Sequence, residues 1–127
     1  KRLKDHYKTH KCATVANSLA WIMATTDDVK FRDGEQAVEF AEEAVAKKKS
    51  HWEQDTLAAA YARSGDFEEA VRIQKKAIEL AENDSMIYTK KEIPEYRKRL
   101  TLYENNRPYT RKIVVSDDKV NDTVPEE

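Results

Sequence analysis

The chain has 127 residues, enough for one domain that buries roughly two-thirds of its unfolded surface. Its composition, with 37% charged residues, two glycines and three prolines, favours helices over hairpins. A net charge of −1 and the absence of a long apolar run exclude a general attraction to nucleic acid and a membrane-spanning segment, so we expect neither nucleic-acid binding nor membrane insertion. The single cysteine, Cys12, excludes an internal disulfide and a four-cysteine zinc site.

Residues 1–10 are polar and are expected to form a lead-in to a helix over about residues 11–25. In that helix apolar residues recur three and four positions apart, which predicts one buried stripe made of Cys12, Val15, Ala16, Leu19, Ala20 and Met23. Because the first residue is Lys1 rather than Met, we expect a processed or excised piece of a longer protein. Whether upstream domains or a signal peptide precede it stays open, as does a cytoplasmic or periplasmic location.

Two further helices are expected to begin at aspartate N-caps. Asp33 precedes a helix that extends to about residue 48, and Gln36 three positions later completes a capping-box pattern. Asp66 precedes a helix over about 67–81, with Glu69 in the equivalent place. Charged residues four positions apart on these and the last helix are expected to form exposed ion pairs: Glu43 with Lys47, Glu68 with Arg72, and Glu95 with Arg99.

A helix over about residues 52–64 is expected between those two, followed by Gly65, which suits the left-handed conformation that ends a helix. The last helix spans about residues 91–105, and its apolar seam is formed by Ile93, Tyr96, Leu100 and Tyr103. Pro94 either lies in the first turn of this helix or kinks a longer one that begins near Ser85. Residues 110–127 contain few apolar groups and are expected to form a flexible tail.

The segments 33–48 and 66–81 carry the same chemistry at an offset of 33 positions. The aspartate caps coincide, and so do the small and branched residues, since Ala37-Val38 matches Ala70-Val71 and Ala44-Val45 matches Ala77-Ile78. A fixed period of this length is typical of stacked helical repeats, in which each unit buries its apolar face on the next.

At Leu57-Ala58-Ala59-Ala60-Tyr61 and Gly65-Asp66-Phe67, followed by Ala70 and Ala77, the chain resembles the tetratricopeptide repeat (TPR). Residues 51–84 align as a full unit, although Gln74 stands at a usually aromatic position and Glu82 replaces the closing proline. Residues 14–48 resemble a degenerate copy with an insertion in the loop over 25–32. The combination is similar to a divergent bacterial subgroup of these repeats, over about residues 14–109.

The resemblance implies an all-α fold. It would be a right-handed α-solenoid of two TPR-like helix pairs, over about residues 14–48 and 51–84, with a C-terminal capping helix over about 91–105. The repeat domain would then comprise residues 11–109, between the lead-in and the tail.

In this family the first helix of each pair lines a concave groove. Carried over position by position, the resemblance implies partner-binding residues at Asn17, Trp21, Trp52, Asp55, Ala59 and Arg63. The tryptophans have an alternative role, in which Trp21 packs on the loop over 25–32 and Trp52 on the turn over 47–49. A clamp for a C-terminal carboxylate, which part of the family uses, is disfavoured because Asp55 would repel that carboxylate.

We therefore expect a non-catalytic protein–protein interaction or scaffold module that binds a peptide or partner domain and needs no cofactor. The sequence has no glycine-rich phosphate loop and no Gly-x-Ser-x-Gly elbow, so an enzyme is not expected. One alternative is a structural capping or self-association fragment of a longer solenoid, which allows a homo-oligomer. A more distant one is a metal site at His6 and His10, with Cys12 nearby.

Overall fold

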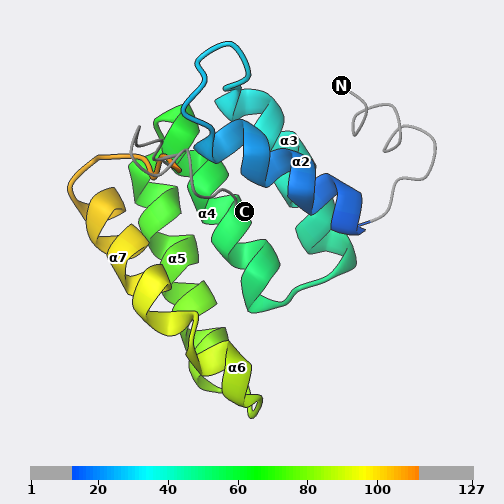
Figure 1. The fold of residues 1–127 in the computed structure, drawn as a ribbon, viewed down its shortest axis with the longest axis vertical. Coiled ribbons are helices and arrows are strands. Elements are labelled where there is room, and N and C mark those ends of the chain that lie inside the picture. Colours follow the sequence, from blue (N-terminus) through cyan, green and yellow to red (C-terminus); the bar gives the residue numbers. More distant parts are fainter. Residues whose placement is uncertain (1–12, 112–127) are drawn as a thin grey trace, which may run out of the picture.

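The computed structural model describes residues 13–111, except for the side chains of residues 87 and 88, and in that range the chain is all-α, without strands. Its helices are α2 (Ala13–Thr25), α3 (Gly34–Lys47), α4 (His51–Ser64), α5 (Phe67–Glu82), α6 (Ile87–Lys90) and α7 (Ile93–Glu104) (Figure 1). The five longer helices begin and end within two residues of their predicted bounds. The lead-in over 1–10, the metal candidate at His6, His10 and Cys12, and residues 112–127 lie outside the described residues.

The helices pack in the order of the chain. α2 lies on α3, α3 on α4, α4 on α5 and α5 on α7, while α4 also contacts α2 (Figure 1). The helix α4 is therefore the centre of the molecule, and most of its residues are buried. None of the helices in the described part of the chain is long and apolar enough to cross a membrane.

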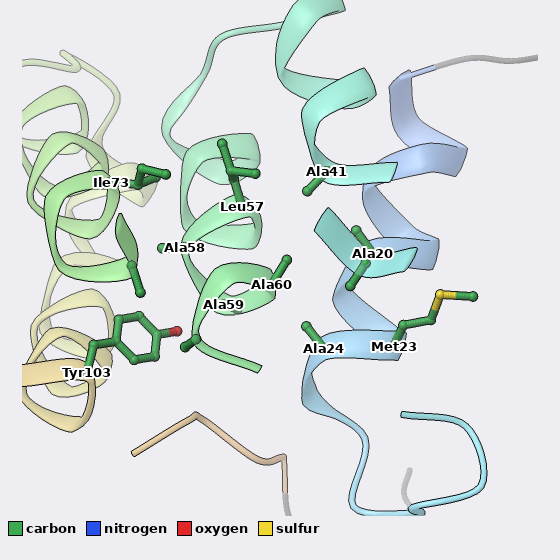
Figure 2. Packing of buried hydrophobic residues seen from close by; sticks show 13 residues of the cluster. Ala20, Met23, Ala24, Ala41, Leu57, Ala58, Ala59, Ala60, Ile73 and Tyr103 are labelled. Carbon is green, nitrogen blue, oxygen red and sulfur yellow. The ribbon is translucent and has the colours of Figure 1, made fainter. Parts of the chain in front are cut away.

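Most of the buried apolar residues between these helices are alanines. Figure 2 shows the central cluster, in which α2, α3 and α4 meet through the completely buried alanines Ala20, Ala24, Ala41, Ala58 and Ala60. Leu57 and Ile73 fill the same cluster, and Tyr103 reaches it from α7. Because the distance between two helix axes depends on the side chains at their contact, small residues at these places allow close packing.

The closest approach lies at Gly34, the first residue of α3. A Cβ atom added there would lie 2.7 Å from the backbone nitrogen of Ser64 and 2.8 Å from its Cα. Glycine is therefore required because α3 begins directly against the C-terminal end of α4.

Only one of the two hydrogen bonds of the capping box predicted at the start of α3 is formed. The Asp33 carboxylate accepts a hydrogen bond from the Gln36 backbone N–H at 3.0 Å. The reciprocal bond from the Gln36 side chain is absent, because that amide donates to the Glu39 carboxylate at 3.1 Å. The Asp33 N–H already donates to the Met23 carbonyl at 3.2 Å, so it does not need the second half of the capping box.

The capping box predicted at the start of α5 is also formed by one hydrogen bond rather than two. Asp66 accepts from the Glu69 N–H at 3.2 Å, and its own N–H donates to the Tyr61 carbonyl at 2.9 Å. The Glu69 carboxylate binds Arg72 instead, with an Nη2 to Oε1 distance of 2.7 Å. The predicted pair of Arg72 with Glu68 is therefore wrong, since Arg72 uses the neighbouring carboxylate.

Pro94 lies in the first turn of α7, which settles the alternative left open by the sequence. The residues before it form the separate helix α6, which the sequence analysis did not predict. Asp84 accepts hydrogen bonds from the Met86 N–H at 2.9 Å and from the Thr89 hydroxyl at 3.2 Å, and Thr89 is fully buried. These bonds hold the turn that leads from α5 into α6, after which α7 returns along α5.

The segment after α7 turns back over the end of α2. Asn106 has a positive φ of 59°, and the Arg107 N–H donates to the Leu102 carbonyl at 2.9 Å. Figure 1 shows the orange segment running from α7 back across the molecule. It is fixed there by a 2.7 Å hydrogen bond from the Arg111 N–H to the Thr25 carbonyl.

Candidate functional site

A groove of about 370 Å³ lies between α2, α4 and the start of α7. Its lining consists of Asn17, Ser18, Trp21, Ile22, Trp52, Asp55, Thr56, Glu92, Tyr96 and Arg99. The structure thus brings four of the six residues implied by the resemblance into one groove, namely Asn17, Trp21, Trp52 and Asp55.

The other two implied residues do not line this groove. Ala59 is only 2% exposed and belongs to the central core cluster, so it offers no surface to a partner. The Arg63 side chain donates from Nε to the Ala24 carbonyl at 2.7 Å, and from Nη2 to the Thr110 hydroxyl at 2.7 Å and the Tyr109 carbonyl at 3.2 Å. Arg63, on α4, therefore ties the segment after α7 (residues 105–111, called the C-terminal segment below) to the end of α2.

Three residues of the groove come from the helix that was expected only to cap the repeats. Tyr96 and Arg99 belong to α7, and Glu92 is its N-cap. Tyr96 was predicted in the apolar seam of this helix, and it is 1% exposed. The sequence signal for Arg99 was misread, because its position one turn after Glu95 suggested an exposed pair on one helix.

Asp55 and Arg99 form the floor of the groove. Arg99 Nε lies 3.0 Å from Asp55 Oδ1, and Arg99 Nη2 lies 3.2 Å from Asp55 Oδ2. Glu95 pairs instead with Lys98 at 3.4 Å, so the predicted pair of Glu95 with Arg99 is wrong. A planar guanidinium and a carboxylate in this two-point contact are held in a fixed geometry, so the floor of the groove is preformed.

Gln74 completes this buried network. Its amide Nε2 donates to Asp55 Oδ1 and to the Tyr96 carbonyl, both at 3.0 Å. The Gln74 side chain is fully buried, and its amide makes hydrogen bonds to the Asp55 carboxylate and the Tyr96 carbonyl that an aromatic ring at this position could not make.

The pKa values of the pair reflect burial and mutual attraction. Burial raises the pKa of Asp55, and the neighbouring Arg99 charge and the Gln74 hydrogen bond oppose that rise. For Arg99, burial acts to lower the pKa, but the Asp55 carboxylate outweighs it and the net direction is upward. Because the two charges face each other at hydrogen-bond distance, they cancel within the groove, and Asp55 presents no free carboxylate to a partner.

Aromatic rings surround the Arg99 guanidinium. Its Cζ lies 5.2 Å from the centroid of the Trp21 ring, 5.5 Å from that of Tyr96 and 5.0 Å from that of Tyr109. The Trp21 and Tyr109 rings are themselves 5.8 Å apart. Trp21 therefore packs on Arg99 and Tyr109, which differ from the loop over 25–32 that was considered from the sequence, and its ring also lines the groove.

Trp52 stands at the rim of the groove and is 39% exposed. Its ring lies 4.1 Å from that of His51, which is buried. His51 Nδ1 is 2.8 Å from the Tyr96 hydroxyl. Burial lowers the pKa of His51 below 6.5, against the opposing effect of Asp84 and other carboxylates. At neutral pH His51 is therefore uncharged and braces Tyr96 from behind the groove.

Glu92 carries the remaining charge of the groove. Its side chain is partly buried and makes no capping hydrogen bond to α7, although it occupies the N-cap position. No ion pair joins it to any residue in the described range 13–111. The opposite charges of Asp55 and Arg99 cancel. The charged residues of the lining therefore sum to a net charge of −1, which lies on Glu92.

Within the described residues no group of three or more His, Cys, Asp or Glu side chains is placed to hold a metal ion. A scan against protein-family models, a search of curated proteins and a search of solved structures each returned no match to this chain.

Proposed function

We propose that the chain is a non-catalytic protein–protein interaction module that binds a peptide or partner domain. In this proposal its helices form a right-handed α-solenoid of two TPR-like pairs, α2 with α3 and α4 with α5, closed by α7. The packing of each helix on the next supports this assignment, and so do the alanines at the contacts. The 33-residue offset between the segments of α3 and α5 supports it independently.

The observation that carries the proposal is the groove between α2, α4 and α7. Its walls contain the rings of Trp21 and Trp52, and large aromatic side chains in a pocket are the residues that most often anchor a partner. Its floor is fixed by the Asp55–Arg99 pair, so a ligand would not pay to order it. A volume of about 370 Å³ suits one or two side chains of a peptide.

The same geometry supports a binding rather than a catalytic role. A general base has to reach the proton that it removes, with a free lone pair. The Asp55 carboxylate instead receives hydrogen bonds from Arg99 and Gln74. Neutral His51 is buried, with Nδ1 directed to Tyr96.

A peptide selection tests the proposal directly. Random peptides displayed on phage are selected against the full chain, and the recovered peptides are measured by fluorescence anisotropy. We expect Trp52→Ala to weaken binding by about tenfold or more, the loss of one anchor residue. Met86→Ala is the control, because Met86 is an exposed apolar side chain (47%) between α5 and α6, outside the groove lining. No enriched peptide, or equal binding by Trp52→Ala, would count against the groove.

Self-association is the second candidate, and a specific surface favours it. Val29 and Phe31 are 69% and 64% exposed in the loop between α2 and α3, which is a place where a second copy would bury apolar area. Sedimentation of the chain at high concentration decides, with Phe31→Ala as the variant. A concentration-dependent dimer that the substitution abolishes supports this role, whereas a monomer at all concentrations removes it.

A further inference from the structure

The groove that the proposed function assigns to a peptide is negative in its electrostatics. Three of the residues that line it carry a charge, namely the carboxylates Asp55 and Glu92 and the Arg99 guanidinium. Arg99 is bound by Asp55, so Glu92 is the carboxylate of the groove lining that no positive side chain in the described part of the chain neutralises. A cationic group entering the groove would therefore be attracted.

The walls have the chemistry that holds a cation. A guanidinium or ammonium is attracted to the face of an indole or phenol ring within about 6 Å. The chain already uses this arrangement once, because Arg99 lies among the rings of Trp21, Tyr96 and Tyr109 with the Asp55 carboxylate at its end. Trp52 and Glu92 line the same groove and supply it with a further ring and a further carboxylate.

From this charge complementarity we infer that the groove receives a lysine or arginine side chain of the partner peptide. Its aliphatic part lies against Trp52 and its charge is paired with Glu92. This inference rests on the proposed function, and it names the anchor residue that the peptide supplies. An acidic anchor would face Glu92, and a neutral one would leave that carboxylate without a partner inside the groove.

The test uses the tightest peptide from the selection and the full chain. Each basic residue of the peptide is replaced in turn by norleucine, which keeps the carbon chain of lysine and removes its charge. Affinities are measured for the wild type, for Glu92→Gln, and for Glu95→Gln as the matched control. Glu95 lies one turn further along α7, and its carboxylate pairs with Lys98 outside the groove.

We expect one norleucine replacement to weaken binding to the wild type and to Glu95→Gln by about tenfold, and to weaken binding to Glu92→Gln far less. Equal losses in all three proteins would overturn the inference, because the basic residue would then act elsewhere. Selected peptides without any basic residue, bound in a Trp52-dependent way, would overturn it as well and leave the proposed function standing. A selection that yields no Trp52-dependent peptide removes both.

Discussion

Asp55 on α4 and Arg99 on α7 form a two-point ion pair across 44 residues of sequence, with both residues less than a tenth exposed. The pair joins the central helix to the last one and sets the depth of the groove between them. Gln74 from α5 binds the same carboxylate, so three helices meet at one buried charge. The stability of the fold and the shape of the site therefore depend on the same atoms.

Arg99→Met should lower the free energy of unfolding by about 3–5 kcal/mol, since it leaves the Asp55 carboxylate buried without its partner. The matched control is Arg97→Met on the same helix. Arg97 pairs with Glu82 where both side chains are about half exposed, and such a pair contributes at most about 1 kcal/mol. Urea denaturation measures both. Equal losses for the two variants would show that the buried pair has no special role.

Gly34→Ala should destabilise the protein by about 1–3 kcal/mol, even though alanine is the better helix former, because the new methyl group collides with the Ser64 backbone. Gly65→Ala is the control. Nothing lies within 4 Å of a Cβ there, and the cost is that of a positive φ of 97°, about 1–2 kcal/mol. The two variants are compared by thermal and urea unfolding. A stabilised Gly34→Ala protein would contradict the close approach of α3 to α4.

His51 should make the stability depend on pH. Its pKa is lower in the folded chain than the unfolded value of 6.5, so the unfolded state binds the proton more readily. The stabilisation that neutral His51 contributes to the free energy of unfolding is complete above pH 6.5. It is lost as the pH falls from there through the pKa of His51 in the folded chain. His51→Gln should therefore show a smaller fall in the free energy of unfolding between pH 7.5 and 5.5 than the wild type. Parallel pH profiles for the two proteins would refute this role of His51.

The C-terminal segment should shield Trp21. In a Trp52→Phe background, where Trp21 is the remaining tryptophan, Tyr109→Ala should shift the fluorescence emission to longer wavelength. The cause is the loss of the ring that lies 5.8 Å from Trp21. Arg107→Ala is the control, because its side chain is exposed in the same segment. A spectrum unchanged by Tyr109→Ala would show that the segment does not cover the indole.

The helices were predictable because their signals are local. Apolar spacing, the Asp33 and Asp66 caps and Gly65 are all read within a few residues, and the structure forms helices within two residues of each expected bound. The four residues of α6 are too few for a periodic pattern, so that helix was missed. The capping boxes were half wrong because hydrogen bonds to the Met23 and Tyr61 carbonyls, at the ends of the preceding helices, already satisfy the cap N–H groups.

The site was predictable only where the resemblance supplied positions, on α2 and α4. Its floor depends on partners far apart in sequence, and no local pattern links Asp55 to Arg99 or to Gln74. Arg99 looked like an exposed partner of Glu95, and Arg63 looked like a groove residue. In the structure Arg63 donates hydrogen bonds to the Tyr109 backbone carbonyl and to the Thr110 hydroxyl, contacts that only the folded chain creates.

The central claim is that the groove between α2, α4 and α7 is the binding surface. The most direct measurement is a nuclear magnetic resonance titration of the ¹⁵N-labelled full chain with a selected peptide. We predict that the indole N–H signals of Trp21 and Trp52 and the backbone signals of Asn17 and Glu92 shift together, while those of the exposed faces of α3 and α5 do not. Shifts confined to α3 and α5, with both indole signals unchanged, would contradict the account.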